Sequence, residues 1–175
     1  MRVNPYMREL LGIGISLLNE PPASSAEIAA RWLEWGMPLD APPQPADLPR
    51  TLDFLAGWRD LVDAASELHR VEAMNALLTD FASAPSVTNH DGSGWHLHYR
   101  ADTAGLGETL AAAVSVAAAE HLTQNGMHRL GRCALPECAR AFADVSRPGR
   151  QRYCSQPCAG RDAVRRHRRR AAAAK

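Results

Sequence analysis

All four cysteines of this chain lie in one short stretch, as two close pairs: Cys133-Ala-Leu-Pro-Glu-Cys138 and Cys154-Ser-Gln-Pro-Cys158. Four residues lie inside the first pair, 15 between the pairs and three inside the second. A structural zinc ion takes four soft ligands in a tetrahedron, and two tight turns that each present two thiolates supply them with little chain. The spacing therefore predicts one structural zinc ion per chain, bound by Cys133, Cys138, Cys154 and Cys158.

Two disulfides or free thiols are alternative interpretations of these cysteines. Residues 1–132 contain no cysteine, whereas a secreted fold held by disulfides spreads its bridges through the chain. The pattern therefore favours thiolate ligands in a reducing compartment, and we expect a cytoplasmic protein. Four thiolates leave zinc no open position, so the site should be structural and not catalytic.

The residues between the cysteine pairs are expected to form a β-hairpin. Its arms would be residues 141–144 and 151–153, joined by a turn at Ser146-Arg147-Pro148-Gly149. A helix would begin at the second pair, since Pro157 is tolerated in a first helical turn. Knuckle, hairpin and a knuckle that opens a helix form a treble-clef-like finger. Metal binding would supply much of the folding energy of so small a unit.

Charge divides the 175-residue chain into two parts. Residues 1–128 carry 7 Arg, no Lys and 16 acidic residues, a net charge of −9, whereas residues 129–175 carry 12 Arg, 1 Lys and 3 acidic residues, a net charge of +10. We therefore predict an acidic domain over 1–128 and a zinc finger with an Arg-rich helix over 129–175. A strongly basic segment favours an anionic partner, most often nucleic acid, although it can also be merely a solvated tail.

The segment after Cys158 predicts a helix with a basic face. Arg161, Arg165 and Arg168 recur at i, i+4 and i+7, so they share one side of a helix. The planar guanidinium group suits both phosphate oxygens and guanine edges. We expect nucleic-acid contacts, with duplex DNA as the preferred partner, from eight arginines of the hairpin and the helix: Arg147, Arg150, Arg152, Arg161, Arg165, Arg166, Arg168 and Arg169.

The first part of the chain shows mainly helical periodicity. Residues 1–20 form an apolar segment that fits either a strand or a helix. Ser24-x-x-Glu27 is a capping box, which opens a helix. Trp32 and Trp35 share one face of that helix. We expect them to belong to the hydrophobic core, and a ligand pocket is the less favoured interpretation.

Two further helical regions and a hairpin complete this domain. Residues 37–50 contain five prolines and predict a loop, after which Thr51 is expected to cap a helix with an apolar stripe over 54–68 and a second stripe over 71–81. Residues 86–100 alternate around an Asp91-Gly92-Ser93-Gly94 turn and predict a β-hairpin. Asp102 or Thr103 is expected to cap a last helix that ends at Asn125-Gly126. The fold class is thus α+β and mostly helical.

The finger resembles that of the CGNR-type zinc-finger proteins, which are regarded as bacterial stress-induced transcription regulators. The matching stretches are 129–138, 142–147, 152–155, 158–161 and 165–168. The early apolar segment that ends in Asn19 agrees more loosely. The name-giving Cys-Gly-Asn-Arg stands here as Cys158-Ala-Gly-Arg161, without the asparagine. The resemblance implies a helical N-terminal domain, a four-cysteine finger and a basic helix, with Arg161 in the place of the family's arginine as a nucleic-acid contact.

These observations predict a DNA-binding transcription regulator at the nucleoid. The acidic domain would form a homodimer, bind a small-molecule ligand or meet a partner. An RNA-binding or ribosome-associated protein and a protein-interaction adaptor are the alternatives. No nucleophile elbow, P-loop or zincin motif is visible, so an enzyme is not expected. No segment has the ~20 consecutive apolar residues of a membrane-spanning helix.

Overall fold

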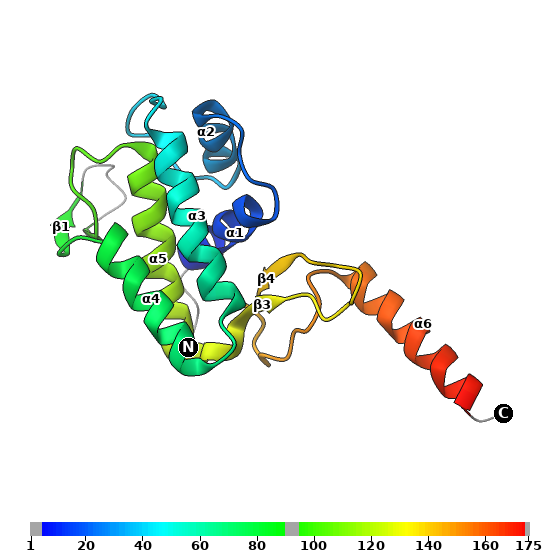
Figure 1. Ribbon diagram of the computed structural model, residues 1–175. Helices are drawn as coiled ribbons and strands as arrows, with labels where there is room; N and C mark the ends of the chain where they lie inside the picture. The colour runs from blue at the N-terminus through cyan, green and yellow to red at the C-terminus, as the bar shows by residue number, and fades with distance from the viewer. Residues whose placement is uncertain (1–4, 90–94, 174–175) are drawn as a thin grey trace.

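The computed structural model describes residues 5–89 and 95–173. Helices dominate it, and the strands are short, which confirms the α+β, mostly helical class (Figure 1). In chain order the elements are α1 (Pro5–Asn19), α2 (Ser25–Glu34), α3 (Asp47–Asp63), α4 (Glu67–Phe81), β1 (Ser86–Thr88), β2 (His96–His98), α5 (Leu106–Asn125), a 3₁₀ helix (Met127–Arg129), β3 (Leu130–Arg132), β4 (Ala141–Ala143) and α6 (Gln156–Ala173).

The core of the N-terminal part lies between α1, α3, α4 and α5. Trp58 and Phe54 of α3 are fully buried and stack with ring centroids 5.9 Å apart. Helix α1 crosses this layer closely because Gly14 carries no side chain. A Cβ there would lie 2.7 Å from a methyl group of Val114 and 3.2 Å from the Trp58 ring. The apolar segment that fitted strand or helix is therefore a helix packed across α3 and α5 (Figure 1).

Local signals placed the ends of two helices correctly. Ser24 Oγ accepts a hydrogen bond from the Glu27 N–H at 3.2 Å, and the Glu27 carboxylate accepts one from the Ala23 N–H at 2.9 Å, so the capping box is formed as predicted. Helix α5 ends at Gly126, whose φ of 110° favours glycine. Trp32 is buried as expected.

The predicted starts of α3 and α5 were wrong. Both helices begin at contacts of a single residue, Asp47. Helix α3 begins at Asp47, four residues before Thr51, which lies buried inside the helix. The Asp47 carboxylate accepts hydrogen bonds from the Gln44 N–H at 2.6 Å and from the Gly107 N–H at 2.9 Å. A side chain distant in sequence therefore binds the first turn of α5, instead of the expected Asp102 or Thr103.

The apolar stripe expected over 54–68 also ends early. The chain leaves the helix after Asp63, and Ser66 caps α4 by accepting a hydrogen bond from the His69 N–H at 3.2 Å. Leu68 consequently lies on α4 and is 66% exposed. Two helices replace one long stripe because the turn between them reverses the chain.

The predicted hairpin over 86–100 is confirmed by two antiparallel strands. Val87 of β1 pairs with Leu97 of β2. The expected turn at Asp91-Gly92-Ser93-Gly94 lies outside the described residues. Among the described helices, none is long and apolar enough to cross a membrane.

The C-terminal hairpin differs from the expected one. Strand β4 pairs with β3, with Gly131 opposite Phe142, so the hairpin encloses the first cysteine pair. Residues 151–153 form no strand, and instead the Arg152 carbonyl accepts a hydrogen bond from the Ala134 N–H at 2.7 Å. Strand β3 is only three residues long and directly follows the 3₁₀ helix. Its sequence is therefore too short to show the alternation of apolar and polar residues that would predict a strand.

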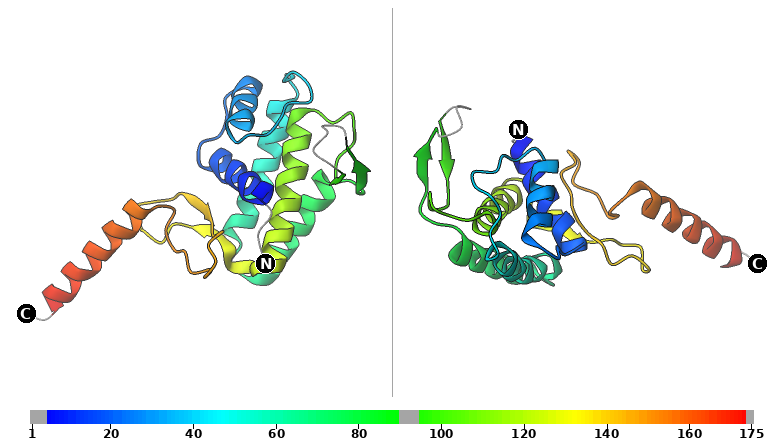
Figure 2. Two further views of the ribbon diagram at one scale, coloured as in Figure 1. Left: turned by 180° about the vertical axis from the view of Figure 1, so that it is seen from behind. Right: turned by 90° about the horizontal axis from the view of Figure 1, so that it is seen from above.

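This second hairpin is packed on the N-terminal part, while α6 points away from it (Figures 1 and 2). Leu130 and Ala141 are buried in the same apolar cluster as α1 and α5. Asn19, at the end of α1, pairs with the outer edge of β4: its side-chain amide donates to the Ala141 carbonyl at 3.0 Å, and its carbonyl accepts from the Ala141 N–H at 2.7 Å.

Asn19→Ala should lower the free energy of unfolding by about 2 kcal/mol, because two backbone groups of the buried Ala141 lose their partner. The measurement is chemical denaturation of the zinc-loaded protein followed by circular dichroism. Asn75→Ala, on the exposed side of α4, is the control and should change stability by less than about 0.5 kcal/mol. Equal stability of the two variants would show that the Asn19 pairing does not hold β4 on α1.

Candidate metal centre

The four cysteine sulfurs converge on one point at the start of α6. All four Sγ atoms lie within 4.8 Å of one another, and Cys154 Sγ lies 3.7 Å from both Cys138 Sγ and Cys158 Sγ. Four sulfurs at about 2.3 Å from a tetrahedral zinc ion are about 3.8 Å apart, whereas a disulfide brings two sulfurs to about 2.05 Å. The geometry is that of a thiolate ligand set, and it can hold one zinc ion.

The first pair is held by the β3–β4 hairpin. The Cys133 N–H donates to the Arg140 carbonyl at 2.9 Å, and the Cys138 N–H donates to the Leu135 carbonyl at 2.8 Å, which closes the turn. Leu135 is fully buried and packs beneath the sulfurs with Tyr153. The hydrogen bonds and these apolar contacts position the two ligands of the first pair.

The second pair opens α6, as predicted. Pro157 and Cys158 lie in its first turn, where the missing N–H of proline needs no partner. Ser155 Oγ accepts a hydrogen bond from the Cys158 N–H at 3.4 Å. Cys158 is therefore presented by the rigid start of a helix, and the direction of α6 is tied to the metal centre.

Two thiols of the cluster have shifted pKa values, in opposite directions. Burial, together with a hydrogen bond to the Cys138 thiol, raises the pKa of Cys154 to about 12. The Ser155 hydroxyl, by hydrogen bonding, lowers the pKa of Cys158. A divalent cation bound among the sulfurs would compensate the charge of adjacent thiolates and favour their ionised form. When bound, zinc would supply charge and a tetrahedral crosslink, with no open coordination position.

Residues 129–171 match the family model of the CGNR zinc finger. The chain carries a CGNR zinc finger. The match begins just before β3 and reaches into the last turns of α6, so the resemblance noted in the sequence is confirmed for the C-terminal part of the chain. A comparison with curated proteins finds no match.

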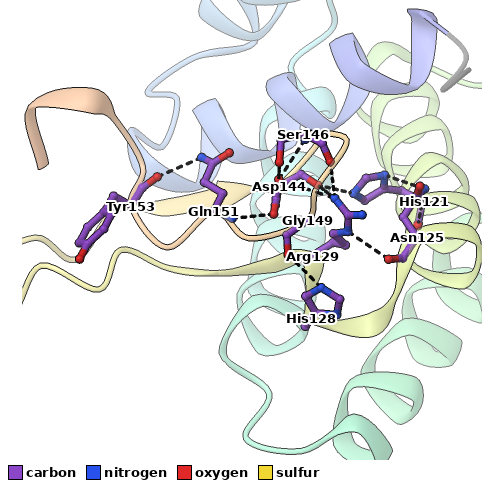
Figure 3. Close-up of polar contacts among 9 residues, drawn as sticks. All are labelled: His121, Asn125, His128, Arg129, Asp144, Ser146, Gly149, Gln151 and Tyr153. Carbon is purple, nitrogen blue, oxygen red and sulfur yellow. Dashed lines mark hydrogen bonds and ion pairs between the residues drawn. The ribbon is translucent and has the colours of Figure 1, made fainter. Parts of the chain in front are cut away.

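A buried carboxylate organises the loop between β4 and the second cysteine pair of the CGNR zinc finger (Figure 3). Asp144 is 1% exposed, and it accepts hydrogen bonds from the Ser146 hydroxyl, from the Ser146 N–H at 2.9 Å and from the Gln151 N–H at 2.8 Å. Burial acts to raise the pKa of Asp144, but these hydrogen bonds outweigh it and hold the pKa below its ordinary value. The loop that carries Arg147 and Arg150 is thereby fixed.

Arg129 and His121 connect this loop to the end of α5. The Arg129 guanidinium donates to the carbonyls of Asn125 at 3.0 Å, Asp144 at 3.2 Å and Ser146 at 2.6 Å. His121 Nε2 lies 3.1 Å from the Asp144 carbonyl, an acceptor, so this nitrogen carries the proton. Its Nδ1 then accepts from the Asn125 amide at 3.4 Å. The sequence analysis did not predict these contacts, because nothing in the sequence distinguishes Arg129 and Asp144 from the other charged residues around them.

The arginines predicted to bind nucleic acid lie where the sequence placed them, with one difference. Arg161, Arg165, Arg168 and Arg169 line one shallow hollow along α6, as the helical spacing indicates. Arg165 alone of the eight is half-buried, and the other seven are exposed: Arg147, Arg150, Arg152, Arg161, Arg166, Arg168 and Arg169. Their roles in binding stay predictions.

The purified protein should contain one zinc ion per chain, and each Cys→Ser variant should lose it. Mass spectrometry under native conditions measures the stoichiometry. A chelator should melt the start of α6 while the circular dichroism of α1–α5 largely remains, because those helices pack on one another. A zinc-free, disulfide-linked mass from freshly reduced protein would contradict the thiolate site, and a global loss of helix would show that both parts unfold as one unit.

His121→Gln should reduce the loss of stability in mild acid. Burial lowers the pKa of His121, so the folded protein keeps it neutral while the unfolded chain takes up a proton below about pH 6.5. Stability is therefore full above that pH and falls by up to about 1.4 kcal/mol per pH unit as the pH decreases towards the folded pKa. Urea denaturation of both proteins with excess zinc, between about pH 5.5 and 7.5, measures the difference. Identical pH dependences would exclude His121 as the group responsible.

Proposed function

We propose that the chain binds duplex DNA through its CGNR zinc finger and acts as a DNA-binding transcription regulator at the nucleoid. The observation that carries this proposal is the exposure of α6. Its 18 residues extend about 27 Å, and of its described residues only Cys158 and Asp162 are buried. A free basic helix of this kind fits the major groove of B-DNA, which is about 12 Å wide.

The distribution of charge supports the same interpretation. Helix α6 points away from the acidic N-terminal domain (Figure 2), which carries a net charge of −9 over residues 1–128. Phosphates bound along α6 therefore stay at a distance from the carboxylates that would repel them. The loop that Asp144 fixes adds two more exposed arginines, Arg147 and Arg150.

Duplex RNA is the weaker candidate for the same surface. The major groove of A-form RNA is too deep and narrow for side chains to read, so an exposed helix has no comparable place to bind. A protein adaptor, the other alternative, would use the arginines against an acidic protein surface. Both alternatives are outcomes of the DNA-binding test below.

The acidic domain would then contribute a homodimer, a small-molecule ligand site or a partner contact. An apolar surface suits a contact with another chain: Val87, Trp95 and Leu97 on and beside the β1–β2 hairpin are 66%, 78% and 52% exposed. Val87 and Leu97 face each other across the two strands.

Arg168→Ala should weaken binding to all duplexes alike and reduce the slope of log affinity against log salt concentration by about one unit, because one phosphate contact is lost. Fluorescence anisotropy with labelled duplexes at several salt concentrations measures both effects. Arg59→Ala, an exposed arginine of α3, is the control and should bind like the wild type. Structured RNA bound more tightly than DNA, or no nucleic-acid binding at all, would replace the proposal with the RNA-binding or the adaptor function.

A further inference from the structure

A buried carboxylate lies among the arginines of α6. Asp162 is 5% exposed, on a helix that carries six arginines. Its Oδ2 accepts a hydrogen bond from the Tyr153 hydroxyl at 2.6 Å. The same oxygen lies 3.0 Å from Arg166 Nε, while Oδ1 is bound by the Arg165 guanidinium. One acid therefore fixes two of the basic side chains.

The two arginines are held in different ways. Arg165 reaches Asp162 with one end of its guanidinium and Glu137, inside the first cysteine pair, with the other at 3.6 Å. Its guanidinium therefore ties α6 to the first knuckle. Arg166 contacts Asp162 through Nε only, and its side chain is 52% exposed. Within residues 5–89 and 95–173 its two terminal nitrogens have no hydrogen-bond or ion-pair partner, so the outer edge of this guanidinium faces solvent.

The contact with Asp162 fixes the orientation of the Arg166 guanidinium, which suits a ligand that presents two acceptors side by side. A guanine presents O6 and N7 in the major groove, and an arginine that contacts both is a common specific contact. An arginine whose orientation is already fixed loses less conformational freedom on binding than a mobile one. Arg168 and Arg169 make no ion pair in the described part of the chain and lie near the end of the helix, so they suit phosphates, which carry no sequence information.

We infer that Arg166 reads a guanine in the DNA that α6 contacts, and that Asp162 and Tyr153 are its positioning residues. The inference rests on the proposed DNA binding. Tyr153 immediately precedes the zinc ligand Cys154, so the metal centre holds the tyrosine, the tyrosine holds Asp162, and Asp162 holds Arg166. Sequence preference, and not only affinity, then depends on this chain of contacts.

A purely electrostatic role of Asp162 predicts the opposite result. If the carboxylate only repelled phosphates, its removal in Asp162→Asn would tighten binding to every duplex. If it positions Arg166, Asp162→Asn weakens the preferred sequence relative to others. The two interpretations differ in the sign of the change for the preferred duplex.

The test begins with selection of preferred duplexes from a random library by the zinc-loaded wild-type protein. The affinity of each variant is then measured for the selected duplex and for a series of duplexes, each with a different guanine–cytosine pair replaced. Arg166→Lys keeps the charge, so the salt dependence should stay as in the wild type, while preference for one guanine should fall by about tenfold or more. Arg169→Lys makes the same chemical change at an arginine without a carboxylate partner, and its preference should stay within about twofold.

Asp162→Asn and Tyr153→Phe should lose preference at the same guanine as Arg166→Lys, with unchanged zinc content. Preference retained in Arg166→Lys, or lost equally in Arg169→Lys, would overturn the inference while leaving the proposed DNA binding intact. A wild type that binds duplexes without any preference would overturn it as well. A wild type that binds no duplex would instead remove the proposed function.

Discussion

Mutual repulsion among four closely spaced thiolates is the constraint on which the finger depends. Sulfurs within 4.8 Å of one another cannot all carry charge in a half-buried site unless a cation lies between them. Burial, together with hydrogen bonds to Cys138 and Cys158, raises the pKa of Cys154 to about 12, so this thiol resists ionisation. A zinc ion held by the four cysteines would offset this repulsion and crosslink the β3–β4 hairpin to the first turn of α6. The direction in which the basic helix leaves the molecule follows from that crosslink.

The finger is in turn attached to helices α1 and α5 by polar groups with little freedom. Asn19 pairs with both backbone groups of Ala141. Arg129 donates hydrogen bonds to three backbone carbonyls, one at the end of α5 and two in the loop after β4. Directional bonds of this kind fix an orientation, whereas apolar contacts alone tolerate sliding. The acidic domain and the basic helix therefore keep a defined relation across the joint.

The sequence alone predicted those features that arise from short-range chemistry. The four ligands followed from cysteine spacing, the start of α2 followed from Ser24 and Glu27, and the basic face of α6 followed from arginine periodicity. The features that were missed depend on contacts between different elements of the fold. Asp47 binds the N–H of Gly107, strand β3 is recognised only by its pairing with β4, and Asp162 is held by a hydrogen bond from Tyr153. Spacing cannot reveal such contacts, since each needs the other partner to be in place.

Helix α6 also carries an internal conflict between its arginines, because it is held as far as Arg165 and exposed beyond it. Arg165 and Arg169, and likewise Arg166 and Arg170, stand four residues apart, where like charges destabilise a helix by a few tenths of a kcal/mol per pair. Salt screens that repulsion and should lengthen the helix in the free protein, while the same salt weakens attraction to phosphates. Helix formation and DNA affinity thus respond to ionic strength in opposite directions. Bound phosphates, by neutralising the arginines, would complete the outer turns of the helix that holds them.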